Sequence, residues 1–263
     1  MRFRSSAGSE TRSGADIWLL DLARGASTRF TFDPTADRFP VWSPDGTRIA
    51  FSSGQDGRVL NLYQKLSSGA GDNQLLLQSD LPKLAMDWSR DGKYLLYVNN
   101  DPKTKYDLWV LPMTGDHQPF PFLRTPFQET GGRFSPDTRW IAYTSNESGR
   151  DEIYVRPFPP AANGGKWMVS RDGGVEPGWR RDGKELYYIG PGGKLMAVAV
   201  SGSSAFQAGI PEGLFTAPVP SVPTVRRWDV TPDGKRFLMS SLANENRMAP
   251  VTVVLNWEVR LRK

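Results

Sequence analysis

The stretch Trp42-Ser43-Pro44-Asp45-Gly46-Thr47-Arg48-Ile49-Ala50-Phe51 decides the fold, because versions of it recur along the whole chain. Its first five residues return at 88–92, 134–138, 179–183 and 230–234, the last copy having its tryptophan moved to Trp228. The aspartates stand at 45, 91, 137, 182 and 233, so the spacings are 46, 46, 45 and 51 residues. A period of this length indicates a repeat architecture.

Each copy of the motif predicts a tight turn followed by a β-strand. Ser or Thr, Pro, Asp and Gly suit a type I turn, in which Pro fixes φ and Gly takes the left-handed position. Apolar residues follow the aspartate at four and six positions, as Ile49 and Phe51 do after Asp45. A period of two predicts a strand with one buried face. We therefore expect the aspartate to accept local backbone hydrogen bonds and to do no chemistry.

Two more strands follow in each repeat. The third is expected at 16–19, 61–63, 107–110 and 152–155, with weaker copies at 194–197 and 251–254. The fourth is expected near 28–31, 74–77 and 167–170. Four short antiparallel strands in about 46 residues describe a propeller blade. Capped helix-period segments are absent from the sequence, which disfavours βαβ folds.

The predicted fold class is all-β, a six-bladed β-propeller forming a single domain over residues 1–263. One domain is expected because a unit of about 46 residues cannot bury its own faces. The first and last blades hold three strands each, so 22 strands are expected, two fewer than six complete blades need. A five-bladed ring with extra strands is the alternative, and the start of the chain falls inside a blade, as though the chain were part of a longer protein. The expected blades are 2–32, 33–78, 79–124, 125–170, 171–216 and 217–257.

Composition narrows the function. The absence of cysteine excludes disulfides, thiolate metal sites and a cysteine nucleophile, and a single histidine disfavours histidine-based metal sites and triads. We therefore expect no metal and no cofactor. The net charge is +5, but the basic residues are scattered singly, so nucleic-acid binding is not expected. No apolar run approaches the ~18 residues of a membrane span, so membrane insertion of this chain is not expected either.

The repeated W-S-P-D-G-x-R-I-A-F and D-I-W/Y-V blocks make essentially the whole chain resemble the TolB-like propellers. A narrower resemblance is to the propeller fused behind bacterial eukaryotic-like serine/threonine kinases, carried by 16–31, 134–157, 179–188 and 253–257. It implies a sensor or scaffold of a larger protein, with protein partners and an extracytoplasmic, periplasmic location, although residues 1–6 start no signal peptide. The sequence holds none of the kinase's own motifs and no Gly-x-Ser-x-Gly nucleophile elbow. Beside the prolyl-oligopeptidase-type peptidases, it would therefore be only the gating propeller half.

The loops that lead into the innermost strands are expected to open at the mouth of the central channel. The first hypothesis is a non-catalytic module that binds a protein, peptide or small molecule at this mouth. The alternative is a hydrolase, in particular a glycosidase, using Glu129, Glu176 and Asp37 as acid and nucleophile or base. We expect Glu129 and Glu176 at equivalent positions of neighbouring blades. A purely structural interpretation pairs the carboxylates with nearby arginines; the charged residues of the mouth are Asp37, Arg38, Glu129, Arg133, Glu176, Arg226 and Arg227.

Aromatic residues and strand edges complete the predictions. Trp42, Trp88, Phe134 and Trp179 share one register and are expected to pack between blades. Trp167 follows two glycines and a lysine, and is expected to be the most exposed tryptophan, a candidate for sugar stacking or partner contact. The incomplete first and last blades leave strand edges, and we expect the chain either to dimerise by pairing them or to leave the ring weakly closed.

Overall fold

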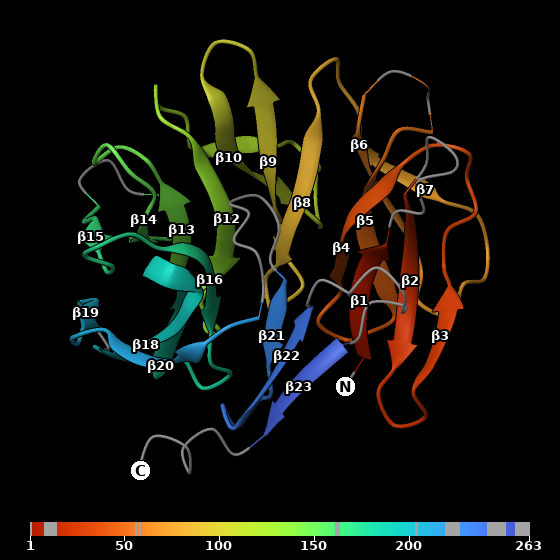
Figure 1. Ribbon diagram of the computed structural model, residues 1–263. Coiled ribbons are helices and arrows are strands. Elements are labelled where there is room, and N and C mark those ends of the chain that lie inside the picture. The colour runs from red at the N-terminus through yellow and green to blue at the C-terminus, as the bar shows by residue number, and fades with distance from the viewer. Residues whose placement is uncertain are drawn as a thin grey trace. The chain divides into compact units, whose positions relative to one another are not determined.

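The computed structural model describes residues 2–7, 15–55, 57, 59–160, 164–202, 205–218, 227–240 and 251–255 (Figure 1). These residues form 23 β-strands and one 3-10 turn, Pro191–Gly193. Within this part of the chain, no helix is long and apolar enough to cross a membrane. The chain divides into two compact units, 1–127 and 128–263, and each is described by itself.

The N-terminal unit contains three antiparallel sheets whose strands pair in sequence order. The first is three-stranded and the other two are four-stranded. Their strands are β1 (Arg2–Ala7), β2 (Asp16–Asp21) and β3 (Ala26–Arg29); β4 (Asp37–Trp42), β5 (Arg48–Ser53), β6 (Asn61–Leu66) and β7 (Gln74–Leu77); and β8 (Lys83–Trp88), β9 (Tyr94–Asp101), β10 (Lys105–Pro112) and β11 (Phe120–Leu123).

The C-terminal unit also contains three antiparallel sheets, with four, five and three strands among the described residues. Their strands are β12 (Glu129–Phe134), β13 (Trp140–Ser145), β14 (Glu152–Pro157) and β15 (Trp167–Met168); β16 (Val175–Trp179), β17 (Glu185–Ile189), β18 (Lys194–Ser201), β19 (Gln207–Ala208) and β20 (Glu212–Thr216); and β21 (Trp228–Val230), β22 (Arg236–Ser240) and β23 (Val251–Leu255).

This arrangement confirms the predicted all-β propeller of six blades with three-stranded first and last blades. The fifth sheet differs from the prediction of four strands. Its outer strand is split into β19 and β20, which pair with opposite ends of the long strand β18. Gly209 and Pro211 lie between the two pieces, and proline donates no ladder hydrogen bond, so the strand is interrupted there. The prediction of a single domain stays a prediction.

The hydrophobic core lies between neighbouring sheets, because each sheet buries the apolar faces of its middle strands. One cluster joins Val41, Ala50 and Leu62 of the second sheet to Leu95 and Tyr97 of the third. Burying each large apolar side chain stabilises the fold by about 1.5–3 kcal/mol. Trp42, Trp88 and Trp179 each pack against a cluster drawn from two sheets, which confirms their predicted place between blades.

The repeated aspartate organises the turn between the first two strands of each blade. Asp45 Oδ1 accepts hydrogen bonds from Ser43 Oγ at 2.5 Å and from the Thr47 backbone N–H at 3.0 Å, and Gly46 has φ 72°. The backbone bond to the residue two positions later recurs in the four other copies, at Asp91, Asp137, Asp182 and Asp233. The predicted structural role of the aspartate is confirmed.

Thr138 occupies the position that glycine holds in the other four turns, and its φ is 61°. A β-branched residue is strained in this left-handed conformation, whereas glycine is not. We expect Thr138→Gly to raise the free energy of unfolding by about 1 kcal/mol, the order of the left-handed penalty, in urea denaturation.

Gly183→Thr provides the matched control, because Gly183 has φ 74° in the equivalent turn. A Cβ added there would lie 3.7 Å from Pro136, an ordinary contact, so backbone strain is the main change. This substitution should lower the free energy of unfolding by about the same amount. Equal stabilities of Thr138→Gly and the parent would show that the turn tolerates threonine without strain.

Candidate functional site

Buried ionisable residues begin the first strand of three successive four-stranded sheets. Asp37 begins β4, Lys83 begins β8 and Glu129 begins β12, spaced by 46 residues, and all three are at most 2% exposed. We call the edge at which these first strands begin the loop edge of each sheet. Backbone bonds join neighbouring sheets within a unit here: Asp37 N–H to Ala15 O at 2.6 Å, Lys83 N–H to Leu60 O at 2.7 Å, and Gly174 N–H to Asp151 O at 2.9 Å.

Asp37 lies in the N-terminal unit, in an acidic setting. Burial raises the pKa of Asp37 to about 6, while the neighbouring Ser53 and Thr31 hydroxyls act in the opposite direction. The negative charges of Asp33 and Asp16 add to the rise in this pKa. An unfolded aspartate titrates near 3.9, so folding favours the protonated form of Asp37.

This shift makes the stability of the protein depend on pH. Between pH 4 and pH 6 the folded state holds a proton that the unfolded chain releases, so stability should fall as pH rises through this window. The loss should be about 2 kcal/mol, and stability from this group should be constant above the window. We expect Asp37→Asn to remove this part of the pH dependence in denaturation measured at pH 4, 5, 6 and 7. An identical pH profile in the variant would show that Asp37 does not titrate in this range.

Lys83 was not among the residues predicted for the site. Burial lowers the pKa of its ammonium group to about 8, and the charge of Asp80 opposes this shift. The ammonium donates to Leu81 O at 2.8 Å and to Ser79 Oγ, both in the loop that precedes β8. The signal in the sequence was its position, one period after Asp37 and one before Glu129.

Glu129 and Glu176 belong to the C-terminal unit, and they do not occupy the equivalent positions that were predicted. Glu129 begins β12 opposite Ser145. Glu176 is the second residue of β16 and lies within a register shift between Val175 and Gly178. It has φ 56°, the left-handed conformation that Gly131 adopts in the corresponding shift of β12. Both strands have this bulge, and the two glutamates differ in their distance from the repeated aspartate: Glu129 precedes Asp137 by eight residues, whereas Glu176 precedes Asp182 by six.

The carboxylate of Glu176 has a structural partner. Its Oε2 accepts the backbone N–H of Arg227 at 3.0 Å, directly before β21. Glu176 therefore connects the fifth blade to the sixth. Glu129 and Glu176 are each 1% exposed, whereas a glycosidase must bring both a sugar and water to its carboxylates.

The arginines predicted at the mouth lie in different environments. Arg38 is exposed. Arg133 is half-buried; its Nη1 donates to Gly132 O at 3.1 Å and its carbonyl oxygen accepts from Trp179 Nε1 at 3.2 Å. Arg227 contributes its backbone N–H to Glu176. Arg226 lies outside the described residues.

Trp167 is not the exposed platform that was predicted. Its ring is half-buried and packs edge-on against Trp140 at 5.4 Å between ring centroids, and against Phe206 at 5.5 Å. A Cβ on Gly165 would meet the indole at 2.5 Å, so the loop before β15 passes directly over the ring. The two glycines that suggested exposure instead allow the loop to cover the tryptophan.

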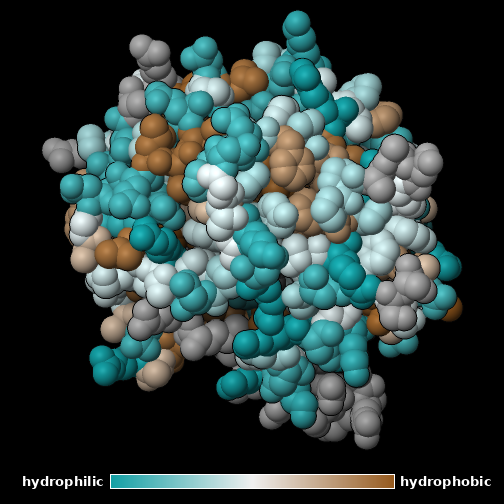
Figure 2. Space-filling model, turned by 180° about the vertical axis from the view of Figure 1, so that it is seen from behind, coloured by the Kyte–Doolittle hydropathy of each residue, from teal (hydrophilic) through white to brown (hydrophobic). Residues whose placement is uncertain are grey.

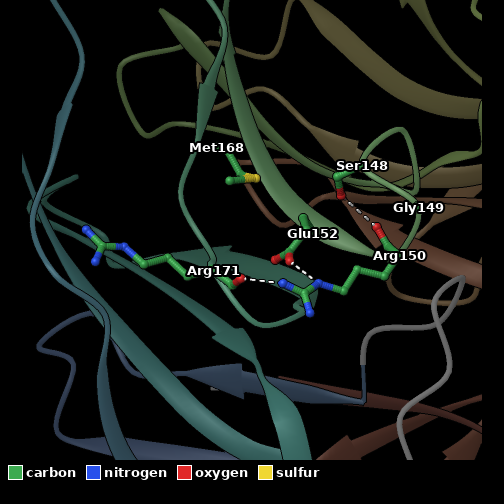
Figure 3. Close-up of a pocket in the computed structure, with 6 residues that line it drawn as sticks. All are labelled: Ser148, Gly149, Arg150, Glu152, Met168 and Arg171. Atoms are coloured by element: carbon green, nitrogen blue, oxygen red, sulfur yellow. Dashed lines mark hydrogen bonds and ion pairs between the residues drawn. The ribbon is translucent and has the colours of Figure 1, made fainter.

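A pocket of about 280 Å³ opens at the loop edge of the fourth blade (Figure 3). Met168 forms an apolar wall and is 52% exposed. The guanidinium of Arg171 points away from Arg150, while its carbonyl oxygen faces that side chain (Figure 3). The volume lies just below the ~300 Å³ at which drug-sized sites begin, so the pocket suits one side chain or a small molecule. Its lining residues are Ser148, Gly149, Arg150, Glu152, Met168 and Arg171.

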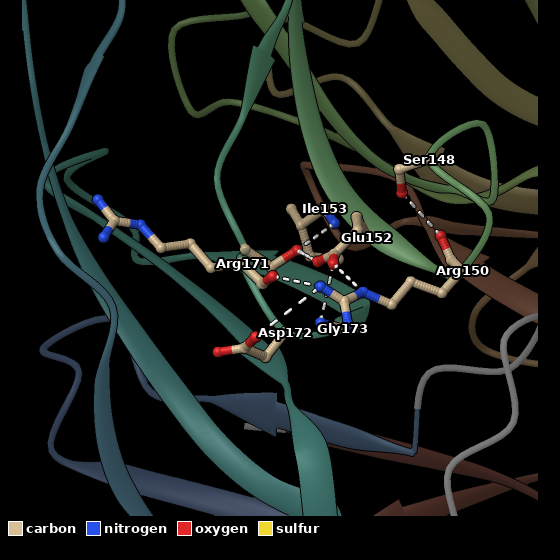
Figure 4. A network of polar contacts seen from close by, with 8 residues as sticks. Ser148, Arg150, Glu152, Ile153, Arg171, Asp172 and Gly173 are labelled. Carbon is tan, nitrogen blue, oxygen red and sulfur yellow. Dashed lines mark hydrogen bonds and ion pairs between the residues drawn. The ribbon is translucent and has the colours of Figure 1, made fainter.

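A polar network anchors the floor of this pocket (Figure 4). Buried Glu152 accepts from Arg150 Nε at 2.7 Å, from the Gly173 N–H at 3.0 Å and from Ser170 Oγ. Ser170 Oγ in turn accepts the Ile153 N–H at 2.7 Å. The residue that begins the third strand has a related role in the second blade, where Asn61 Oδ1 accepts the Ser79 N–H at 3.1 Å. The third strand of both blades thus begins with a side chain that fixes the following loop. In the fourth blade, Arg150 is an additional partner of that side chain.

The described residues of the site supply binding groups more readily than reactive ones. Among them, no group of three or more His, Asp or Glu side chains is placed to hold a metal ion. The loop edge of the C-terminal unit offers an apolar thioether, a serine hydroxyl and guanidinium groups around a small pocket. Such a surface can bind a ligand without any proton transfer.

No protein-family model matches the chain. Over 84 residues, 31% of this chain, it is 31% identical to an uncharacterized peptidase, YuxL, of Bacillus subtilis strain 168, and this region is 12% of that relative's length. TolB from Acinetobacter baumannii superposes with a TM-score of 0.70 at 16% identity, over 92% of this chain and 57% of TolB. A puromycin-hydrolyzing peptidase of Mycobacterium tuberculosis superposes with a TM-score of 0.60 at 16% identity, over 86% of this chain and 39% of the peptidase.

The chain therefore spans little more than half of TolB and a much smaller share of the curated peptidase. At 16% sequence identity, these superpositions establish a shared fold and no shared function. The six antiparallel sheets of this chain form a TolB-like β-propeller, a fold that TolB shares with the hydrolytic neighbour.

Proposed function

We propose that this chain is a non-catalytic β-propeller module that binds a protein, peptide or small molecule at its loop edge. The observation that carries the proposal is the state of the two glutamates considered for catalysis. Both are 1% exposed, and the carboxylate of Glu176 accepts the backbone N–H of Arg227. Glu176 thus connects two blades, and the burial of both glutamates leaves them poorly placed to meet a substrate.

The pocket of the fourth blade is the binding site that the geometry favours. It lies between the loop after β13 and the loop before β16, so its lining comes from segments that sequence changes can alter without disturbing the sheets. Met168 supplies apolar contact, and Arg150 is held in one orientation by Glu152 and by Arg171 O. A preorganised side chain loses less conformational entropy on binding.

The proposal includes a role as the sensor or scaffold part of a larger, kinase-like protein. The resemblance of the repeat blocks to kinase-associated propellers supports it. A rigid propeller can present a binding edge to a ligand while another part of the protein responds.

Binding at the pocket can be tested with the purified chain and a panel of tripeptides and monosaccharides in a thermal-shift assay. At least one probe should raise the melting temperature saturably, because a ligand that binds only the folded state stabilises it. Met168→Glu should abolish that shift, since it places a charge on the apolar wall of the pocket. Ile210→Glu, at another exposed apolar residue of the same unit, is the matched control and should preserve the shift. No shift with any probe, or a shift unchanged in Met168→Glu, would contradict this site.

The alternative function is hydrolysis, and the peptidase relative is the observation that favours it. The 84 matched residues include no Gly-x-Ser-x-Gly motif, because this sequence contains none, so a serine peptidase would need catalytic residues from elsewhere. A glycosidase would need Glu129 and Glu176 to become accessible. In either case the propeller described here would position or admit the substrate.

A further inference from the structure

Strand β7 forms the outer edge of the second blade, and the strand carries neither charge nor proline (Figure 1). In the sheet order β4-β5-β6-β7, its neighbour is β6 alone. The sequence from Asn73 to Ser79, N-Q-L-L-L-Q-S, contains neither a charge nor a proline. A strand edge of this kind presents unpaired backbone N–H and C=O groups that another chain can pair with.

Several other outer strands carry a protecting feature within the described residues, although β23 at the edge of the sixth sheet also lacks charge and proline. Strand β11 contains Pro121, which cannot donate to a further strand. Strands β15 and β19 are only two residues long. In the three-stranded first sheet, β3 ends in Arg29, which is ion-paired with Asp16 at 2.8 Å. Proline, short length and charge are the devices by which proteins close an edge, and β7 carries none of them.

The side chains of β7 are also available for contact. Leu75 is 50% exposed, and Leu66 at the end of the neighbouring strand β6 is exposed as well. The register pairs Leu77 with Leu62 and Leu75 with Tyr63, so Leu76 is the extra residue of a bulge. Figure 2 shows brown, hydrophobic areas among teal, hydrophilic ones on one face of the molecule. Leu75 and Leu66 therefore offer apolar contact to a segment that pairs with this edge.

The charges around β7 favour a basic partner, although the whole chain carries +5. Exposed Asp72 and Asp80 flank the strand at its two ends. Asp33 adds a third carboxylate beside the first end, where its Oδ2 accepts from Asn73 Nδ2 at 2.8 Å. Two cations lie near these carboxylates: half-buried Arg48, which donates to Gln74 Oε1 at 3.1 Å, and buried Lys83, which donates to Ser79 Oγ. The exposed charges that flank the strand, Asp72 and Asp80, are both acidic.

We propose that the free edge of β7 binds an extended peptide segment by strand addition, and that this segment has an apolar centre flanked by lysine or arginine. In strand addition, backbone hydrogen bonds pair the peptide with the strand edge, and alternate side chains of the peptide determine the specificity. Pairing with a second copy of the chain is disfavoured, because an antiparallel register centred on Leu76 sets Asp72 of one copy opposite Asp80 of the other. Like charges in opposite positions destabilise a strand pair.

The test uses two fluorescein-labelled peptides, Lys-Lys-Val-Thr-Val-Ile-Thr-Lys-Lys and the same peptide with four glutamates in place of the lysines. Fluorescence anisotropy should show saturable binding of the lysine peptide and binding about fivefold weaker for the glutamate peptide, the effect of two exposed charge pairs. Raising the salt concentration should narrow this difference, because exposed charges are screened. Hydrogen exchange of the complex should show new protection within β7, residues 74–77.

Leu75→Lys is the decisive variant, because a charge on an exposed edge position blocks pairing without disturbing the core. It should weaken binding of the lysine peptide about tenfold, while Ile210→Lys and Met168→Glu leave it unchanged. The Met168→Glu result separates this site from the proposed pocket, so either can fail without the other. The proposal is overturned if the lysine peptide does not bind saturably, if both peptides bind equally, if Leu75→Lys binds as the parent does, or if the new protection lies outside β7.

Discussion

Replacing Trp228 by alanine is expected to lower the free energy of unfolding by about 4 kcal/mol. Trp228 begins β21 and is 1% exposed. Its ring lies 6.3 Å from that of Tyr187 and 6.2 Å from that of Phe237, in the cluster that joins the fifth and sixth blades. The substitution removes the largest side chain of that cluster, and the rigid strands around it cannot close the resulting cavity. Urea denaturation followed by tryptophan fluorescence and circular dichroism measures the loss.

Phe32→Ala is the matched control, because Phe32 is exposed and its ring is covered on one side by Arg29, 5.0 Å from the ring centroid. We expect this variant to lose less than about 1 kcal/mol. A loss for Trp228→Ala no larger than for Phe32→Ala would mean that the last blade contributes little to the folded unit.

Glu152→Ala is expected to lower the free energy of unfolding by about 3 kcal/mol. The substitution removes the common acceptor of Arg150 Nε, the Gly173 N–H and Ser170 Oγ. Two of these donors belong to the loop that leads into β16, so the packing of the fifth blade on the fourth should weaken as well. Arg150 is largely exposed and can regain water, which keeps the cost at the lower end for a broken buried ion pair.

Two further variants separate hydrogen bonding from charge. Glu152→Gln retains an acceptor oxygen for Arg150 and Gly173 and should lose about 1 kcal/mol. Asp172→Ala removes an exposed carboxylate that lies 3.8 Å from Arg150, and it should change stability by less than about 0.5 kcal/mol. If Glu152→Ala were as stable as Asp172→Ala, the hydrogen bonds of Glu152 would contribute nothing measurable to the stability of the blade.

The blades could be predicted from the sequence because their information is local. The turn around Asp45 places Ser, Asp and Gly within four residues, and each of these residue types has one dominant use there. The alternation after it, Ile49 and Phe51, assigns the buried face of the next strand. The same turn and strand pattern then recurs along the chain at a spacing of about 46 residues. The split of the last strand of the fifth blade into β19 and β20 was missed, because it depends on pairing with both ends of β18.

The site was harder to predict because its residues depend on tertiary context. Glu176 was predicted to match Glu129, but it lies within the bulge at Val175–Gly178, whereas Glu129 precedes the corresponding bulge of its own strand. Trp167 was expected to be exposed because glycines precede it, but those glycines let the chain pass over its ring. Lys83 was detectable from the period alone. The pocket beside Arg150 combines two loops about 20 residues apart, and no pattern within either loop indicates it.

A buried carboxylate can therefore have either of two roles in this fold, one chemical and one structural. Burial without a partner raises a pKa and can prepare a general acid, whereas burial with backbone donors fixes a loop. Glu152 and Glu176 belong to the second kind, because both accept backbone N–H groups from a following segment. The proposed function rests on this distinction.

Hydrolysis assays on the parent chain, Glu129→Gln and Glu176→Gln test that distinction most directly. A panel of chromogenic glycosides, esters and aminoacyl anilides should be assayed at pH 5, 6, 7 and 8, with circular dichroism confirming that each variant is folded. We predict rates no higher than the buffer blank for all three proteins, because neither glutamate meets solvent. Saturable turnover by the parent that falls at least about 100-fold in either folded glutamine variant would contradict the account, since that is the effect of losing a general acid or base.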